Sequence, residues 1–538
     1  MRLLRRVPVV VGLAVTLLAL ARLLVPSPVG LADQGDAHRL LCQVGVRDAT
    51  PIEDRTGWGR SSDAYVPFVW EDHTWYGEGC GAGGTDETYR SSQVTLLRAA
   101  KALTALGGFD GDLDLRALAV VCSLLLGLLS GVLVSVLPGP RPVRVVIVAC
   151  LALTLLDRGA AGVFASGYTE PAALLGLLAT LAASLVVLRA RRPSPAALVA
   201  LAGSGLFTVT ANRQMVAVLP QVLAALLWRP ADPAPDADDA DVPVGAGSRR
   251  PPAAEGRWAD GPGGPRGRGE RASRLLAAGL ALVVLAVAVR HVGAQPERLA
   301  QLDRHDQVFN GILLLGNDPE RDLADLGLDP ALVAARGLDR DEAREIVAGD
   351  DYRAVEALTD LDVARHLATH PRESWLLVRR GVDAAARFGG ETYLGSYRAG
   401  DGAEPYQTEN RIWLVGVFFE IADAVPALLV GTVGFAAWLG LRSLRRARTR
   451  DGRALAAVAV GVAAAAAATF VVTIFVAGQV ELTRRLLVTN VLVAWSIPLA
   501  VGAHLAEREP PPPLVLPPDA PEPDDPDPDD VGPEDPEP

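Results

Sequence analysis

Long uninterrupted apolar runs restrict the fold of this chain more than any other feature of its sequence. About 20 consecutive apolar residues cross the hydrocarbon core of a bilayer as one helix. Half of the 538 residues are hydrophobic, and most are gathered into such runs instead of being spaced as in a soluble core. The runs lie at about 8–26, 115–137, 143–163, 170–189, 195–228, 274–291, 411–441, 454–477 and 486–504. We therefore predict a mostly α-helical, polytopic membrane protein.

Two of these runs need a separate interpretation. Residues 195–228 are too long for one crossing and are interrupted by Thr-Ala-Asn-Arg-Gln, so we read them as a hairpin of two short helices. Residues 1–26 have the basic head and apolar body of a signal peptide. Their apolar part runs for roughly 18 residues without a clear cleavage site, which favours a retained first helix. The chain then has about ten crossings.

The distribution of arginine predicts the direction of each crossing, because cytoplasmic loops collect Lys and Arg. With ten crossings, the arginines at 2–6, 141–144, 189–192, 229–273 and 442–453 all fall on the cytoplasmic side. Both chain termini then lie there too. We therefore predict a multi-pass protein of the cell membrane with its N- and C-termini in the cytoplasm.

The predicted topology divides the chain into segments of different composition. Residues 229–273 are rich in Pro, Gly and Arg, and residues 505–538 are rich in Pro and Asp, so both are predicted to be unstructured. The net charge of −12 belongs to the tail, because ten acidic residues follow Pro518 and leave about −2 for the rest. The predicted order is a first helix at 1–26, an exterior loop at 27–114, helices with the hairpin at 115–228, a cytoplasmic linker at 229–273, a helix at 274–291, an exterior helical domain at 292–410, C-terminal membrane helices at 411–504 and the tail at 505–538.

The four cysteines are too few for a disulfide scaffold. Cys42 and Cys80 share the first exterior segment, where oxidising surroundings would allow a disulfide between them, and two unpaired thiols are the alternative. Cys122 and Cys150 lie inside apolar runs and are expected to be packing residues of membrane helices.

Charged and polar residues gather where the predicted helices end on the exterior side. A charge at the bilayer centre costs about 2.5 to 3.5 kcal/mol on insertion scales, so such residues are candidates for function. Taken singly, each is better explained as an interface anchor or as part of a structural ion pair. Four groups on one side favour a site: Asp33, Asp36 and Arg39; Glu170; Asn212, Arg213 and Gln214; and Glu481, Arg484 and Arg485.

Acids paired with arginines at a membrane surface suit the transfer of a group that is activated as a lipid phosphate. A carboxylate accepts the proton of an acceptor hydroxyl, and guanidinium groups hold the leaving phosphate. Such a reaction needs no ATP, which agrees with a sequence that has no G-x-x-x-x-G-K-[ST] motif and no predicted cytoplasmic domain.

Five short motifs together resemble a known family. They are DQGDAHRL at 33–40, YTEP at 168–171, ANRQ at 211–214, VFNGILLLGNDPERDLADLGLDP at 308–330 and GQVELTRRL at 478–486. In this order they resemble the polytopic bacterial hexosyltransferases of surface-glycan biosynthesis, which are GT-C-type glycosyltransferases that use polyprenyl-phosphate sugars. The likeness covers most of the chain apart from the linker and the tail.

The resemblance implies a GT-C-like fold and an inverting transfer on the exterior face, from a polyprenyl-phosphate sugar to a glycan acceptor. It implies Asp36 as the catalytic base, with Asp33 as second choice. Arg39 and Arg213 would face the phosphate, and the pocket would be completed by Glu170, Gln214, Glu481 and Arg484. Many relatives have Asn in place of Asp33 and Lys in place of Arg213. A divalent metal, Mg or Mn, held by Asp33 and Asp36 therefore stays open, while no other cofactor and no nucleic-acid partner is expected.

Other functions remain open on the sequence. Polytopic helices with charges near the membrane also occur in transporters, so the alternative is a flippase for lipid-linked glycans. Against it, the chain shows no internal repeat and places about 200 residues outside the membrane. A third interpretation is a non-catalytic scaffold in which Glu420 and Asp423 mediate helix contacts.

Histidines offer only weak signals. His366 and His370 are four residues apart and could share a helix face, but no third ligand follows in HExxH form, so the spacing favours structural roles over zinc. His38 beside the acidic loop is likewise interpreted as a hydrogen-bonding surface group rather than a metal ligand.

Overall fold

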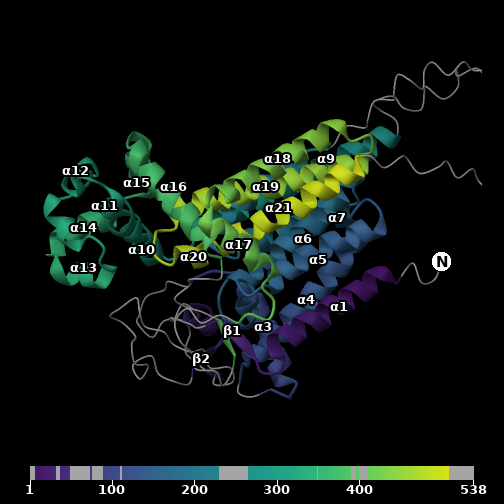
Figure 1. Cartoon of the computed structure of the whole chain (residues 1–538), viewed down its shortest axis with the longest axis horizontal. Coiled ribbons are helices and arrows are strands. Elements are labelled where there is room, and N and C mark those ends of the chain that lie inside the picture. The colour runs from purple at the N-terminus through teal and green to yellow at the C-terminus, as the bar shows by residue number, and fades with distance from the viewer. Residues whose placement is uncertain are drawn as a thin grey trace, which may run out of the picture.

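The protein is a bundle of long membrane helices with a smaller helical domain at one end (Figure 1). The computed structural model describes residues 6–31, 37–48, 73–75, 89–109, 112–229, 265–347, 349–388, 396–398 and 409–507. The predicted linker is therefore described only at its two ends, and the predicted tail only at 505–507. The orientation of the chain termini is a prediction.

Seven of the described helices are long and apolar enough to cross a membrane. They are α1 (Val7–Leu24), α4 (Leu115–Val136), α6 (Glu170–Arg189), α9 (Pro265–Gly293), α18 (Ala427–Arg446), α19 (Arg450–Val476) and α21 (Leu487–Ala506). Two shorter apolar segments, α7 (Pro195–Val209) and η5 with α8 (Arg213–Val218, Leu219–Leu227), occupy the place of the predicted hairpin. The prediction of a mostly α-helical, multi-pass membrane protein is confirmed.

Three of the predicted spans differ from the helices in the structure. The crossing expected at 143–163 is shorter, because α5 (Arg141–Leu156) ends at a buried Asp157. The run at 411–441 forms two helices, α17 (Leu414–Ala424) and α18, with the break before Pro426, whose ring cannot continue a helix. The helix α9 begins at Pro265, inside the predicted unstructured linker, where an Arg274 to Glu270 ion pair of 2.5 Å supports its first turns.

The predicted exterior loop at 27–114 also contains a helix. Residues Gln93–Ala105 form α3, which buries Val94, Leu97 and Ala100 along one face. Their spacing of three residues is helical, but the segment is short and only moderately apolar, so its sequence does not predict a membrane helix.

The remaining described elements are short and mostly helical. They are β1 (Val29–Leu31), α2 (His38–Leu41), η2 (Cys42–Val44), β2 (Val46–Asp48), β3 (His73–Trp75), η4 (Ala161–Ala165), α10 (Glu297–Gln307), the π-helix η7 (Val308–Ile312), α11 (Leu313–Leu315), α12 (Pro319–Asp325), η8 (Pro330–Ala335), α13 (Arg340–Ile346), α14 (Gly349–Ala357), α15 (Asp360–Thr369), α16 (Pro371–Ala386), β4 (Ser396–Arg398) and α20 (Leu482–Arg485). Local sequence explains several helix starts: Asp339 with Glu342 and Thr359 with Asp362 form capping boxes at α13 and α15.

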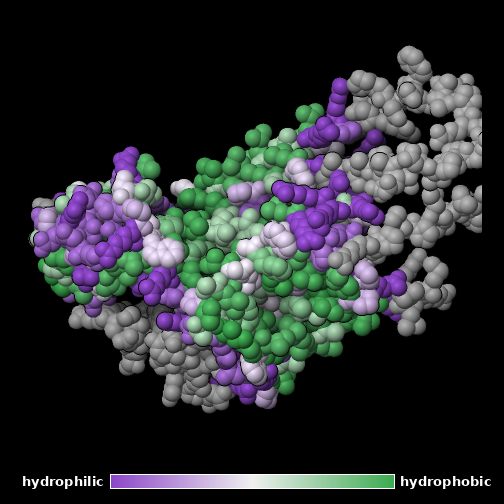
Figure 2. Space-filling model, turned by 45° about the horizontal axis from the view of Figure 1, so that its top comes forward, coloured by the Kyte–Doolittle hydropathy of each residue, from purple (hydrophilic) through white to green (hydrophobic). Residues whose placement is uncertain are grey.

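The surface shows how the bundle meets its surroundings. An apolar band covers the helices between a polar helical domain and a polar opposite end (Figure 2). Large apolar side chains such as Leu17 on α1, Leu282 on α9 and Trp438 on α18 are exposed in the bundle. Exposed apolar surface of this extent needs lipid around it.

Arginines mark the end of the bundle that lies away from the helical domain, and we call it the arginine end. Arg189 closes α6, pairs with Asp451 of α19 at 2.5 Å and donates to the carbonyl of Val136 at the end of α4. Arg450 Nε donates to the Leu188 carbonyl at 3.4 Å. The predicted cytoplasmic arginines on these helices therefore lie together.

Two distant segments are tied together at the opposite end. The strand β1 follows α1 and pairs antiparallel with β4, with Gly30 opposite Tyr397. Close by, Glu409 accepts from Arg398 at 2.6 Å and from Arg411 at 2.7 Å, and it also pairs with Arg22 of α1. The side chains of Arg22 and Glu409 are 1% and 2% exposed. This buried network fixes the start of the first predicted exterior segment to the end of the second.

The cysteines divide into two kinds. Cys42 is disulfide-bonded, while its predicted partner Cys80 lies outside the described residues, so their pairing stays a prediction. Cys122 and Cys150 are free. Cys122 is buried as expected, whereas Cys150 is exposed on α5 and does not pack inside the bundle.

Candidate active site

A cavity of ≈ 490 Å³ lies where the membrane helices meet the helical domain. Side chains from α2, η5, α10 and α20 reach it, together with the loop before α6 and the end of α19. It is lined by every described residue predicted for the catalytic pocket: Arg39, Glu170, Arg213, Gln214, Glu481 and Arg484. Four groups that are far apart in the sequence are thus brought to one place.

The two predicted catalytic aspartates, Asp33 and Asp36, lie outside the described residues. The chain is described again from Ala37, which packs on Gly167: a Cβ added to that glycine would lie 2.6 Å from the Ala37 Cβ. Two residues further on, Arg39 lines the cavity. The residue that follows Asp36 is therefore held beside the Tyr-Thr-Glu-Pro motif, which contributes Glu170.

Asp303 of α10 lies between two arginines of the cavity. Its Oδ1 is 2.8 Å from Nη1 of Arg485 in α20, and its Oδ2 is 3.5 Å from Nη1 of Arg213 in η5. Arg213 also pairs with Asp360 at the start of α15. One carboxylate thus links the hairpin, the last interhelical loop and the helical domain, and it holds two guanidinium groups at the cavity.

Burial governs the acidity of this part of α10. It raises the pKa of Asp303 to about 6, although Arg485 and Arg213 both favour the carboxylate. It raises the pKa of Asp306 to about 7, against the opposing effect of Arg485. Asp306 is 4% exposed, and its Oδ1 accepts from Asn310 at 3.4 Å. Two carboxyl groups of the cavity are therefore poised to exchange protons near neutral pH.

The loop Gly478–Arg485 has an unusual backbone. Glu481 adopts a left-handed conformation with φ of 55°, which side chains other than glycine rarely adopt. Gly478 has φ of 80°, and a Cβ there would lie 2.9 Å from Asp306 Cβ, so only glycine fits. The strained turn directs Glu481 to pair with Arg484, whose guanidinium lies 4.6 Å from the centre of the Tyr168 ring.

Polar contacts join the hairpin to the start of α6. Asn212 caps η5 by accepting from Met215 N at 3.1 Å, and its Nδ2 donates to Thr169 Oγ1 at 3.2 Å. Gln93 of α3 accepts from Ala172 N at 3.0 Å inside the first turn of α6. These bonds position Glu170, which is 9% exposed, at a helix N-terminus.

The two sides of the cavity differ in chemistry. The last residues of α19 and the following loop contribute the apolar side chains of Val472, Val476 and Val480. The opposite lining is dense in arginines and carboxylates. Such a cavity can hold an amphipathic molecule with an apolar portion toward the membrane helices and an anionic group among the arginines.

Sequence reasoning missed the contributions of α10 and α15. Asp303, Arg304 and Asp306 belong to the stretch Leu-Asp-Arg-His-Asp, a charged turn shortly after a membrane helix, and Asp360 begins α15. The high density of charged residues after α9 is the sequence feature that could have predicted that α10 contributes to the cavity. The sequence places Arg485 in the same charged group but does not predict it for the pocket, although it lies closer to Asp303 than Arg213 does.

Other predicted contacts lie outside the cavity. Glu420 and Asp423 do mediate contacts between helices and loops: Glu420 pairs with Arg158 at 2.6 Å, and Asp423 with Arg387 at 3.6 Å. Among the described residues, one group of His and Asp side chains has the spacing to hold a metal ion, namely Asp322, His366 and His370. The side chain of His38 is not described.

The fold and the cavity define a class: a multi-pass α-helical membrane protein with a charged pocket at one end of its helices. Within that class, the chain belongs to the family described as the YfdI N-terminal transmembrane domain, which it matches over residues 2–229 and 265–509. The unmatched residues coincide with most of the predicted linker and tail. No curated protein and no solved structure matches the chain.

Proposed function

We propose that this protein is an integral-membrane glycosyltransferase that moves a sugar from a polyprenyl-phosphate donor to a cell-surface glycan. The observation that carries the proposal is the cavity at the end of the membrane helices, in which arginines, carboxylates and an apolar wall meet. Membership of the YfdI family agrees with a glycan-related role in the membrane.

The donor has the same two-part character as the cavity. Its polyprenyl chain belongs in the bilayer and would enter past Val472 and Val476 at the end of α19. Its phosphate is a bidentate partner for guanidinium groups, which Arg39, Arg213 and Arg485 offer at the charged side. The sugar would then lie between the phosphate and the acceptor, close to the loop that precedes Arg39.

The proposed reaction is a direct displacement at the anomeric carbon. A carboxylate removes the proton of the acceptor hydroxyl, whose oxygen forms the new glycosidic bond. The bond between the anomeric carbon and the phosphate oxygen breaks, and the electron pair leaves with the polyprenyl phosphate. Because attack and departure occur on opposite faces, the configuration at the anomeric carbon inverts. Arginines stabilise the charge that develops on the phosphate.

Asp36 is the proposed base, with Asp33 as its neighbour or as a ligand to a divalent cation. Two observations on described residues support this placement: Ala37 packs on Gly167, and Arg39 lines the cavity. Glu170, Gln214, Glu481 and Arg484 are proposed to position sugar and phosphate. Transfer would take place on the exterior side, which corresponds to the end of the bundle opposite the arginine end.

The test is transfer of a radiolabelled sugar from polyprenyl phosphate in membranes that contain the full chain. We expect Asp36→Asn to lower the rate by about 10²- to 10⁴-fold, the usual contribution of a general base. Asp329→Asn is the matched control, because Asp329 is an exposed helix cap whose Oδ1 accepts from Ala331 N at 2.7 Å, and asparagine caps equally well. Undiminished transfer by the Asp36 variant would contradict the proposed base.

The flippase alternative makes a different prediction in detergent. A flippase needs two sides of a sealed membrane, whereas a glycosyltransferase works on solubilised donor and acceptor. We expect the purified chain in detergent to retain transfer. Donor movement across vesicles without any transfer in detergent would favour the flippase.

A further inference from the structure

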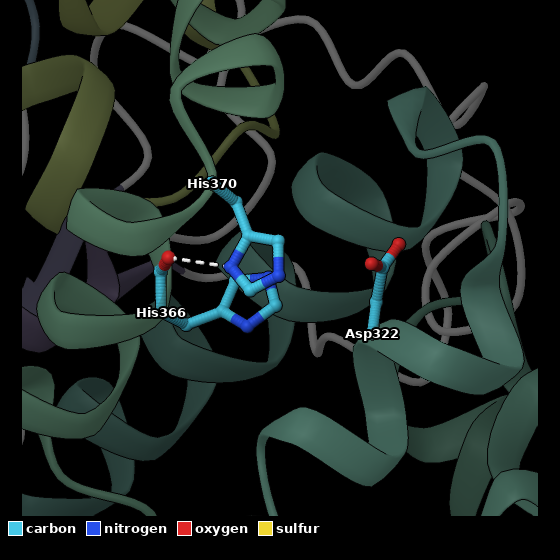
Figure 3. A group of neighbouring side chains, drawn as sticks. All are labelled: Asp322, His366 and His370. Atoms are coloured by element: carbon cyan, nitrogen blue, oxygen red, sulfur yellow. Dashed lines mark hydrogen bonds between the residues drawn. The ribbon is translucent and has the colours of Figure 1, made fainter.

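We propose that Asp322, His366 and His370 form a binding site for a divalent transition-metal ion, with Zn²⁺ as the best-suited ion. The three residues come from α12, from α15 and from the turn between α15 and α16. Each offers one ligand atom, and these atoms lie within 4.8 Å of one another. Figure 3 shows the carboxylate of Asp322 across from the two imidazole rings. The site lies outside the cavity and does not depend on the proposed transferase activity.

Hydrogen bonds fix which nitrogen of each histidine can bind a metal. His370 Nδ1 lies 2.8 Å from the backbone carbonyl of His366, shown as the dashed line in Figure 3. A carbonyl only accepts, so Nδ1 carries a proton, and Nε2, which lies 3.2 Å from Asp325 Oδ2, is the nitrogen left for the ion. His366 Nε2 lies 2.9 Å from Glu373 Oε2, which likewise leaves the lone pair on Nδ1. In metal sites, histidine ligands are oriented in this way by a carboxylate or a carbonyl on the second nitrogen.

Two of the atoms that face the proposed ion lack a hydrogen-bond partner. His366 Nδ1 and Asp322 Oδ2 are buried and have no hydrogen-bond partner in the described structure, and both residues are 4% exposed. An unsatisfied buried polar atom costs about 1 to 3 kcal/mol, and here two of them belong to neighbouring metal-ligand side chains. A bound cation would satisfy both at once.

The residues around the proposed site leave room for the Asp322 carboxylate and offer a further ligand. Gly316 lies against Asp322, where any added Cβ would collide with the carboxylate. Asp325 is placed at the edge of the group, with its Oδ2 3.2 Å from His370 Nε2, and is the candidate fourth ligand. Two imidazoles with carboxylates suit Zn²⁺, whereas Mg²⁺ and Ca²⁺ prefer oxygen ligands alone.

The proposed ion would fasten α12 to the α15–α16 corner of the helical domain. Of these helices, α16 continues toward the bundle, where it contacts α19 and α20. The metal would thereby stabilise the platform from which α10, α15 and α20 present side chains to the cavity. Because the ion binds the folded domain and not the unfolded chain, binding raises thermal stability.

The experiment uses the full chain purified in detergent, stripped with a chelator and titrated with Zn²⁺. We expect about one Zn²⁺ per chain by elemental analysis, as for a single closed site, together with a rise in the unfolding temperature. His370→Gln, a partly exposed position that should fold normally, should lose this binding, and Asp322→Asn should do the same. Glu373→Gln should weaken the affinity by about 10- to 100-fold, because it disturbs the orientation of His366.

His504→Gln is the matched control, since His504 pairs with Glu507 at 3.0 Å at the end of α21, away from the group. It should bind Zn²⁺ like the wild type. The proposal is overturned if the wild type binds no Zn²⁺, or if His370→Gln and Asp322→Asn bind it as tightly as the wild type does. Circular dichroism of the variants without metal shows whether a loss of binding comes from misfolding.

Discussion

At the scale of single residues, the cavity balances charges that are costly to bury. Asp303 lies between Arg213 and Arg485, which compensate its charge. Asp306 is more deeply buried and accepts a hydrogen bond of 3.4 Å from Asn310. A buried carboxylate without full compensation prefers its proton, which is why burial raises the pKa of Asp306 to about 7. The raised pKa of Asp306 can be tested through the pH dependence of the protein's stability.

We expect Asp306 to make the folded protein less stable as the pH rises. The folded state holds a proton on Asp306 up to about pH 7, while the unfolded chain releases it near the ordinary value of 3.8. Stability therefore falls between these two values, by on the order of a few kcal/mol. Asp306→Asn mimics the protonated form and should remove this loss. Thermal unfolding in detergent should show similar midpoints near pH 4, close to the unfolded value of 3.8, and a higher midpoint for the variant at pH 8.

The left-handed backbone at Glu481 gives a second prediction. Glu481→Gly relieves a strain of about 1 to 3 kcal/mol but loses the ion pair with Arg484, so its stability should stay near that of the wild type. Glu481→Gln keeps the strain and loses the charge, and should unfold at a lower temperature. Both variants should lose transfer activity. A glutamine variant that is as stable as the glycine variant would show that the turn stores no strain.

At the scale of elements, close packing of α1 on α4 positions the first loop. A Cβ added to Gly12 would lie 2.9 Å from the carbonyl oxygen of Gly127, and one added to Gly131 would lie 2.8 Å from that of Pro8. Gly127 and Gly131 form a Gly-x-x-x-Gly pattern, through which membrane helices approach closely. The helix α1 leads directly to β1 and the predicted Asp33 and Asp36.

Gly127→Leu should therefore separate α1 from α4. An added Cβ at Gly127 would lie only 2.5 Å from the Gly12 carbonyl oxygen, so the backbones must move apart. Overpacking of this kind costs about 1 to 3 kcal/mol, and the displaced first loop should lower transfer activity as well. Gly203→Leu is the matched control, because nothing lies within 4 Å of a Cβ there. Equal unfolding temperatures for the two variants would contradict the close packing.

At the scale of the whole molecule, a buried ion network holds the bundle and the segment before α17 together. Glu409 is shared by Arg22, Arg398 and Arg411, and Arg22 also donates to the carbonyl of Leu156 at 3.2 Å. Removing the shared acid leaves the buried Arg22 without compensation, which is more costly than losing one exposed pair. The network therefore holds α1 of the bundle to the segment before α17, at the end of the bundle where the cavity lies.

Glu409→Gln should destabilise the protein by about 3 to 5 kcal/mol, the usual loss when one partner of a buried pair is removed. A clear fall in the thermal unfolding midpoint is expected. Glu345→Gln, at an exposed position of α13, should leave the midpoint unchanged. Equal unfolding midpoints for the two variants would show that the network does not contribute to stability.

The sequence by itself determined the membrane class, the positions of most membrane helices, and the charged groups that meet at the cavity. These properties are local, because hydrophobic runs and charges at helix ends follow from the solvent on either side of a bilayer. It could not show that Pro426 divides a predicted span, or that α9 continues to Pro265.

Only the tertiary structure decided which distant side chains meet. Asp303 and Arg485 are 2.8 Å apart although 182 residues separate them. The fold brings Asp322 of α12 to His366 and His370, and the isolated histidine pair gave no reason to expect a third ligand. Such distances depend on how the helices pack against one another. Because that packing involves residues from the whole chain, it cannot be read from any one segment.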